Sequence, residues 1–175
     1  MAKETNIAYF AGGCFWCTEA AFDYQAGVLE TISGYLGGEA KNANYQAVAA
    51  GNTNHFEALK VVYDPKQVNY QELLEVYWQS IDPSDAGGQF ADRGSQYQTA
   101  IFYLDEAQKQ IAIASKEAVA KRLKIEVATQ ILPFNNFYPA EAYHQDYHQK
   151  NKLHYNLYKH GSGRVKKLKE IWQAD

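Results

Sequence analysis

Cysteine is scarce in this chain, with two residues among 175. A single pair in a reducing cytosol is more typical of redox catalysis or metal binding than of a structural disulfide. The chain also lacks a strong excess of either charge, because its net charge is −3 and both signs are mixed along the sequence. Nucleic acid is therefore not expected as a partner.

Long apolar runs are absent as well. No stretch approaches the roughly 18 apolar residues that a membrane-spanning helix needs, and the Met1 end has no charged segment followed by an apolar one, as a leader would. We therefore expect a cytoplasmic monomer with no membrane partner. The length favours one domain over residues 1–175, with a basic tail from about residue 152.

Tyrosine, in contrast, is abundant, with 14 Tyr against 8 Phe, which indicates many half-buried rings with a usable hydroxyl. Short apolar or alternating segments predict strands at 5–11, 28–36, 55–63, 99–104 and 126–133. Helical spacing and capping residues predict helices at 14–23, from 69 onward, and at 105–123, 139–151 and 164–172.

The order of these elements predicts the fold class. It begins with a split β-α-β-β-α-β unit, so we expect an α/β (α+β) protein, a ferredoxin-like two-layer sandwich with a mixed sheet. Between two of the elements, residues 80–97 form a Gly/Asp-rich loop of a length that is usually functional. Trp78 and Trp172 are expected in the core, and the basic stretch 164–169 on a solvated helix face.

The two cysteines stand three positions apart, in Cys14-Phe15-Trp16-Cys17 after two glycines. A disulfide between them is within reach, because residues i and i+3 of a helical turn lie close together. A helix N-terminus lowers the pKa of a thiol. We therefore expect Cys14, at the predicted helix start, to have the lower pKa and to attack, and Cys17 to resolve the product. Two inert, buried thiols are the alternative.

Two further interpretations of the pair are open. Cys14 and Cys17 with His144 and His148 would make a tetrahedral zinc set, although the two pairs are much further apart than in compact zinc modules. A thiol-disulfide oxidoreductase also carries Cys-x-x-Cys between a strand and a helix. There, however, the bulky rings between the cysteines would block the flat approach of a protein disulfide.

Six motifs follow one another between residues 7 and 151. They are Gly13-Cys14-Phe15-Trp16, Tyr35-Leu36-Gly37-Gly38, Tyr45–Val48 with Gly51–Glu57, Val62–Pro65, Asp92–Tyr97 and Phe137–Gln145. In this order they resemble the peptide methionine sulfoxide reductases of the A type.

The chain departs from that family's pattern at three places. First, Cys17 stands where many members have Gly. Second, Asn54–Glu57 stands for Gly-His-x-Glu and Gln89-Phe90-Ala91 for Gln-Gly-Asn. Third, the tail after Asn151 lacks the Gly-Tyr-Cys used for recycling, with Tyr155 near that place. The first and third departures fit together, and the chain resembles the subgroup that forms its disulfide within Cys-Phe-Trp-Cys.

The resemblance implies reduction of the S epimer of methionine sulfoxide, free or in oxidised proteins. In that chemistry the Cys14 thiolate attacks the sulfur, Glu57 acts as the acid, and Tyr45 and Tyr97 donate hydrogen bonds to the sulfoxide oxygen. Burial is expected to raise the pKa of Glu57. Without the resemblance, Glu57 would be interpreted as a solvated strand residue.

The resemblance also implies the remaining roles. Phe15 and Trp16 hold the substrate methyl group, and Asp92 positions the helix start or the polar part of the substrate. Cys17 condenses with the Cys14 sulfenic acid to a disulfide, which thioredoxin or another dithiol reduces. No metal or bound cofactor is required. Glu141 and His144 are expected to tie the last helix to the site.

This hypothesis can be checked by counting thiols. Reduced protein incubated with each methionine sulfoxide epimer should lose two thiols per methionine formed, and with one epimer only. A protein-disulfide oxidoreductase or a zinc-binding module would form no methionine with either epimer.

Overall fold

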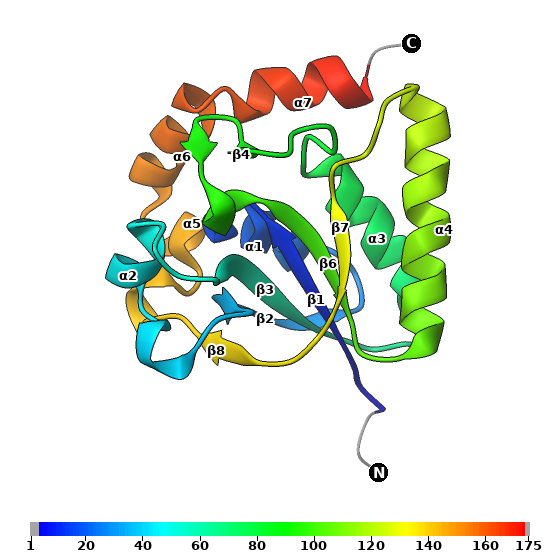
Figure 1. Ribbon diagram of the computed structural model, residues 1–175, viewed down its shortest axis with the longest axis horizontal. Coiled ribbons are helices and arrows are strands. Elements are labelled where there is room, and N and C mark those ends of the chain that lie inside the picture. Colours follow the sequence, from blue (N-terminus) through cyan, green and yellow to red (C-terminus); the bar gives the residue numbers. More distant parts are fainter. Residues whose placement is uncertain (1–3, 174–175) are drawn as a thin grey trace.

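The computed structural model describes residues 4–173 of the protein (Figure 1). Its centre is a six-stranded sheet with the strand order β7-β6-β1-β3-β2-β8. These strands are β1 (Asn6–Gly12), β2 (Val28–Leu36), β3 (Phe56–Tyr63), β6 (Thr99–Tyr103), β7 (Gln130–Pro133) and β8 (Phe137–Pro139). A separate two-stranded sheet joins β4 (Gly88–Gln89) to β5 (Asp92–Arg93) within the predicted long loop.

The helices gather mostly on one face of the sheet and at one end of it (Figure 1). They are α1 (Phe15–Asp23), α2 (Tyr45–Ala49), α3 (Tyr70–Gln79), α4 (Glu106–Leu123), α5 (Tyr147–Lys150), α6 (Lys152–Gly161) and α7 (Arg164–Trp172). Short 3₁₀ turns lie at Ala40–Asn42, Ser95–Tyr97 and Ala142–His144. Within residues 4–173, none of the helices is long and apolar enough to cross a membrane.

The sheet confirms the predicted fold class. The split unit corresponds to β1, α1, β2, β3, α3 and β6, and its strands lie in the order β6-β1-β3-β2 with every neighbouring pair antiparallel. The sheet becomes mixed because β7 runs parallel to β6, whereas β8 is antiparallel to β2. β1 is therefore a central strand, and its last residue leads directly into the cysteine pair.

The main core lies between the sheet and the helices α1, α3 and α4. Phe10 of β1 stacks on Phe22 of α1 and on Tyr77 of α3, with ring centroids 5.1 Å and 5.0 Å apart. Trp78 is fully buried and donates from its Nε1 to Ser115 Oγ at 2.6 Å. These contacts confirm Trp78 as a core residue and anchor α1 against the sheet.

Several predicted element boundaries are confirmed. β2 has the predicted bounds, and Asn69 and Glu72 form the predicted capping box of α3. Asp105 accepts the backbone N–H of Gln108 at 2.8 Å and so caps α4. Each of these features is set by residues close in sequence, which explains why the local pattern predicted them.

The predicted helix over 139–151 is wrong for most of its length. Pro139 ends the strand β8, where it lies opposite Gly34 of β2, and the N–H of Ala140 donates to the Ser33 carbonyl at 2.8 Å. Helix α5 begins only at Tyr147. The free edge of β2 offers backbone partners to this segment, and those hydrogen bonds outweigh the preference of proline for a helix start.

The prediction of a solvated face over 164–169 is wrong at Arg164. This side chain is buried, donates to the carbonyls of Ser80 at 2.7 Å and Gly12 at 3.2 Å, and lies over the Phe90 ring at 4.6 Å. Phe90 itself has φ 55°, a left-handed conformation that a residue with a side chain adopts at a cost. The tail thus fastens α7 to the end of β1.

We expect Gly34→Ala to lower the free energy of unfolding by roughly 1–3 kcal/mol through overpacking. A Cβ at Gly34 would lie 2.4 Å from Phe137 Cζ and 2.5 Å from the Tyr138 carbonyl oxygen, so β8 must move off β2. Urea unfolding measures the change. Gly161→Ala is the matched control, because a Cβ there meets nothing within 4 Å. Equal unfolding midpoints for the two variants would contradict the tight packing of β8.

Candidate active site

The cysteine pair follows a turn that the sequence builds with glycine. Gly13 has φ 84°, and a Cβ there would lie 2.7 Å from Gln89 Cβ, so both the conformation and the space require glycine. Cys14 is the N-cap of α1, and its carbonyl accepts the N–H groups of Cys17 at 3.1 Å and Thr18 at 3.2 Å. The turn therefore places both thiols in the first turn of the helix.

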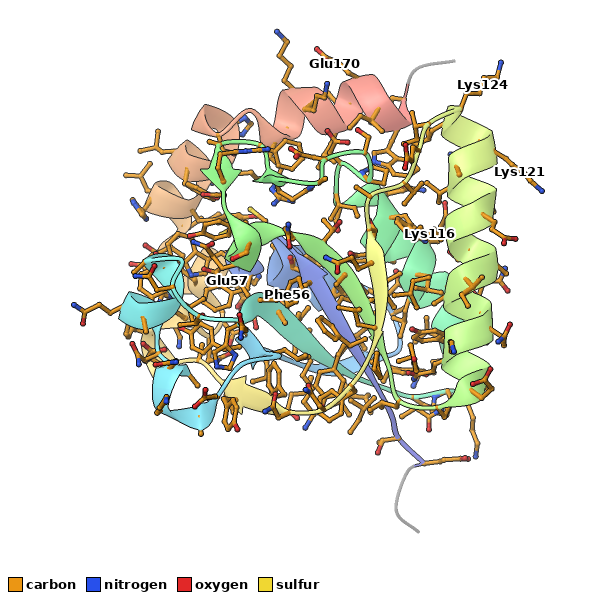
Figure 2. The ribbon with its side chains drawn as sticks, in the orientation of Figure 1. Phe56, Glu57, Lys116, Lys121, Lys124 and Glu170 are labelled. Carbon is orange, nitrogen blue, oxygen red and sulfur yellow. The ribbon has the colours of Figure 1, made fainter. Side chains whose placement is uncertain are left out.

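Glu57 lies on β3, beside the start of α1 (Figure 2). Its Oε1 accepts the backbone N–H of Phe15 at 3.1 Å, and the residue is 2% exposed. Burial raises the pKa of Glu57 to about 8, with a further increase from the charge of Asp92, while the Phe15 N–H acts in the opposite direction. The carboxyl group is therefore protonated at neutral pH, and the predicted effect of burial is confirmed.

A cavity of about 60 Å³ brings the predicted residues together. Its lining contains Cys14, Phe15, Trp16, Tyr45, Glu57, Asp92, Tyr97 and Tyr158. Every site residue predicted from the sequence except Cys17 contributes to it. The cavity is large enough for a small group such as a methyl sulfoxide and leaves the rest of a substrate outside.

The two predicted phenol donors come from different elements. Tyr45 opens the short helix α2, and Tyr97 ends the 3₁₀ turn Ser95–Tyr97. Burial, and next the charge of Glu57, raises the pKa of Tyr45 to about 12, and the same causes raise the pKa of Tyr97. Both hydroxyls therefore keep their protons. Within the described residues neither hydroxyl has a hydrogen-bond partner, so both can donate to a bound group.

Trp16 forms a fixed wall of the cavity. Its indole stacks on Tyr147 with centroids 3.9 Å apart, and its Nε1 donates to His144 Nδ1 at 3.0 Å. Burial lowers the pKa of His144, which keeps the ring neutral and Nδ1 free to accept. Glu141 accepts the Tyr35 hydroxyl at 2.8 Å and the Tyr45 N–H at 3.0 Å. His144 and Glu141 thus connect the segment after β8 to the site, in place of the helix that was expected there, because α5 begins only at Tyr147.

Tyr158 is a site residue that the sequence reasoning missed. It lies on α6, its hydroxyl donates to Asp92, and its ring meets Trp16 edge-on at 5.7 Å between centroids. Asp92 therefore holds this tyrosine rather than the helix start. Tyr155 and Tyr158 stand three residues apart in the basic tail, and that helical spacing is the signal that could have identified α6.

The two thiols are buried, reduced and hydrogen-bonded to each other. Burial, and next the contact with Cys17, raises the pKa of Cys14. The hydrogen bond from Cys14 lowers the pKa of Cys17 to about 6. Burial raises this pKa, whereas the charges of Arg164 and Lys159 lower it further. The expectation that Cys14 has the lower pKa is therefore wrong for the resting pair.

The physical reason lies at the helix start. The Cys14 side chain accepts no backbone N–H of α1, and Glu57 accepts that of Phe15. The favourable end of the helix is thus occupied by a carboxyl group, and Cys14 faces carboxyl groups instead of cations. Of the two thiols, Cys17 is therefore the one whose anionic form the surroundings favour.

The zinc set considered from the sequence does not form. His144 Nδ1 accepts the Trp16 indole N–H, and His148 Nε2 lies 3.0 Å from the Asp23 carboxylate. Among residues 4–173, no group of three or more His, Cys, Asp and Glu side chains is placed to hold a metal ion.

A thiol pair beside a protonated acid and two phenols defines a thiol-dependent oxidoreductase that acts on a small polar group. The sequence model of the family described as peptide methionine sulfoxide reductase matches residues 6–175. This chain is 48% identical over 174 residues to peptide methionine sulfoxide reductase MsrA of Bacillus licheniformis, covering 98% of this chain and 96% of the relative. It is 47% identical over 176 residues to the Bacillus subtilis MsrA, covering 99% of each.

Solved structures agree with these matches. Reduced Mxr1 of Saccharomyces cerevisiae superposes with a TM-score of 0.81 at 32% identity, covering 85% of this chain and 87% of the yeast chain. Methionine sulfoxide reductase A of Corynebacterium diphtheriae gives a TM-score of 0.80 at 35% identity, covering 85% and 76%. The chain belongs to the peptide methionine sulfoxide reductase family. It is an enzyme that reduces methionine sulfoxide, which confirms the resemblance and the activity predicted from the motifs.

The raised pKa of Glu57 generates a pH prediction. An acid with a pKa of about 8 is lost as the pH rises through that value, so methionine formation in a single turnover should decline above about pH 8. Glu57→Gln should lower the rate by roughly 10²–10⁴-fold and remove this decline, because an amide does not titrate.

The pH profile is measured from pH 6 to 10 by quantifying released methionine. Glu30→Gln is the matched control on an exposed strand position and should keep the wild-type profile. A Glu57→Gln enzyme that still declines near pH 8 would show that another group supplies the proton.

Proposed function

We propose that this enzyme reduces the S epimer of methionine sulfoxide, free or in oxidised proteins, with Cys14 as nucleophile and Cys17 as resolving thiol. The observation that carries the proposal is the cavity shared by the Cys14 thiol and the Glu57 carboxyl group. A nucleophile for sulfur and an acid for oxygen must reach the same substrate group at once. No bound cofactor enters the reaction, because the thiols supply both electrons.

Substrate orientation follows from the two halves of the cavity. The sulfoxide oxygen accepts hydrogen bonds from Glu57, Tyr45 and Tyr97, and the methyl group lies against Phe15 and Trp16. When the oxygen and the methyl group occupy these positions, only one configuration at the substrate sulfur leaves that atom accessible to attack by the Cys14 thiol. This is the basis for selecting one epimer.

In the first step the Cys14 Sγ forms a bond to the substrate sulfur as its proton passes to Cys17. The sulfoxide oxygen takes a proton from Glu57. The hydroxyl group then passes from the substrate sulfur to Cys14 Sγ and the bond between the two sulfurs breaks, which leaves methionine and the sulfenic acid of Cys14. The substrate sulfur gains two electrons and Cys14 loses them.

In the second step Cys17 attacks the sulfur of the Cys14 sulfenic acid. A disulfide forms and the hydroxyl group leaves as water, protonated from the surrounding acid groups. Both cysteines lie in the first turn of α1, so the thiols are already neighbours when the sulfenic acid appears. Resolution therefore needs no rearrangement of a distant segment.

We propose thioredoxin or another dithiol as the reductant of this disulfide. The yeast structural neighbour Mxr1 has been solved in complex with Trx2, which supports a thioredoxin partner. The reducing cytoplasm would contain such a dithiol. We place the enzyme there as a monomer formed by one methionine sulfoxide reductase domain over residues 1–175.

Cysteine variants test the assignment of roles. Cys17→Ser should release one methionine per enzyme and stop, because the sulfenic acid on Cys14 then has no neighbouring thiol. Dimedone labelling followed by mass spectrometry should find that acid on Cys14. The Cys14→Ser variant should release none. Repeated turnover of Cys17→Ser with thioredoxin, or a single turnover by Cys14→Ser, would contradict the roles.

A further inference from the structure

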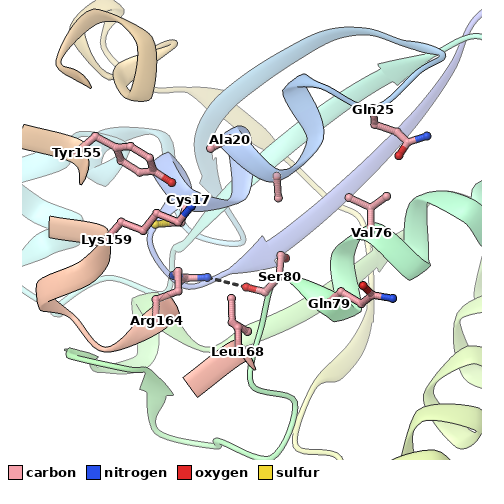
Figure 3. Close-up of a pocket in the computed structure, with 11 residues that line it drawn as sticks. Cys17, Ala20, Gln25, Val76, Gln79, Ser80, Tyr155, Lys159, Arg164 and Leu168 are labelled. Atoms are coloured by element: carbon pink, nitrogen blue, oxygen red, sulfur yellow. Dashed lines mark hydrogen bonds between the residues drawn. The ribbon is translucent and has the colours of Figure 1, made fainter. Parts of the chain in front are cut away.

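Cys17 faces a second cavity, separate from the one that contains Cys14 (Figure 3). This cavity has a volume of about 410 Å³ and lies between α1, α3, α6 and α7. Cys17 forms part of its wall, with Tyr155 and Lys159 from α6 and Arg164 from α7. The reaction with methionine sulfoxide uses none of this space.

The second cavity is positively charged around the Cys17 sulfur. Arg164 and Lys159 both act on that sulfur, and both stabilise its anionic form. Arg164 is held rigidly by its hydrogen bonds to the Ser80 and Gly12 carbonyls. In the part of the chain that the structure describes, neither cation lies within ion-pair distance of a carboxylate. Among the described residues, no carboxylate therefore forms an ion pair with the two cations that line this cavity.

The Cys14 side has the opposite character. Its cavity measures about 60 Å³ and is lined by the carboxyl groups of Glu57 and Asp92. An incoming thiolate attacks a disulfide sulfur from the side opposite the leaving sulfur. Attack on Cys17 from the larger cavity is compatible with this requirement, because Cys17 lines that cavity and Cys14 does not. Attack on Cys14 would compete with the substrate for a smaller and more acidic space.

We propose that the Cys17 cavity is a binding site for small anionic thiols, which reduce the Cys14–Cys17 disulfide by attacking Cys17. The ligand class is a low-molecular-weight thiol that also carries a carboxylate or sulfonate. Its sulfur meets Cys17 near Arg164, and its second anionic group contacts Lys159. This inference rests on the proposed disulfide, and it adds a second class of electron donor to the dithiol.

Two molecules of the thiol are needed to reduce one enzyme disulfide. The first thiolate forms a bond to Cys17 Sγ, the bond between the cysteine sulfurs breaks, and Cys14 leaves as a thiolate that takes up a proton. A second thiolate attacks the sulfur of the bound ligand and releases Cys17 as a thiolate. Two thiols are oxidised to one disulfide, and the enzyme disulfide gains two electrons and returns to two thiols.

The test begins with the purified oxidised enzyme, so that methionine sulfoxide takes no part. The rate of disulfide loss is measured with 2-mercaptoethanesulfonate and with 2-mercaptoethanol, each corrected for its thiolate fraction. Wild-type enzyme should prefer the sulfonate roughly three- to ten-fold at low salt, because the cavity attracts anions. The preference should shrink as the salt concentration rises.

Variants of one helix locate the effect. Lys159→Gln should remove the preference for the sulfonate, and Lys159→Arg should restore it. Lys152→Gln is the matched control, because Lys152 is an exposed residue of α6 outside the cavity lining. The proposal would be overturned if the wild type showed no preference for the sulfonate. It would also be overturned if Lys159→Gln slowed the reaction with both thiols by the same factor.

The point of attack is tested on the same samples. Rapid alkylation after brief treatment with 2-mercaptoethanesulfonate should place the alkyl group on Cys14 and the sulfonate adduct on Cys17, as tandem mass spectrometry can distinguish. The reverse labelling would overturn the assignment to Cys17. An enzyme that forms no Cys14–Cys17 disulfide after a turnover would instead refute the proposed function, so the two failures are distinguishable.

Discussion

The hydrogen bond from the Phe15 N–H to Glu57 Oε1 is the interaction on which the rest of the site depends. It joins the start of α1 to the central strand β3, and so places an acid beside the thiol of Cys14. It also occupies the helix end that would otherwise stabilise a thiolate. Burial favours the neutral form of this carboxyl group more than the Phe15 N–H favours the charged form, which makes it a proton donor at neutral pH.

The surroundings of the thiol pair differ on its two sides. Carboxyl groups and phenols surround Cys14, while Arg164 and Lys159 surround Cys17. The half around Cys14 suits a neutral sulfoxide whose oxygen becomes more basic during the reaction. The half around Cys17 suits an anion. Two neighbouring sulfurs thus meet two kinds of reactant from opposite directions.

The fold and much of the site could be predicted because short-range patterns determine them. The bounds of β2 and the cap at Asn69 follow from adjacent residues, and Glu57 was identified through its motif. What escaped prediction depends on contacts between distant segments. Tyr158 reaches the site through Asp92, and Arg164 is bound by carbonyls of residues far from it in the sequence, Ser80 and Gly12. A basic pattern in the tail cannot reveal such partners.

Arg164 also determines when the enzyme becomes complete during synthesis. Its two acceptors, Ser80 and Gly12, lie 84 and 152 positions earlier in the chain. Helix α6, which carries Tyr158 and Lys159, and helix α7, which carries Arg164, follow every strand of the sheet in the chain, so they are synthesised after the segments on which they dock. Until these helices dock, both thiols of the nascent chain are exposed, and neither lies in the cavity in which it meets its reactant.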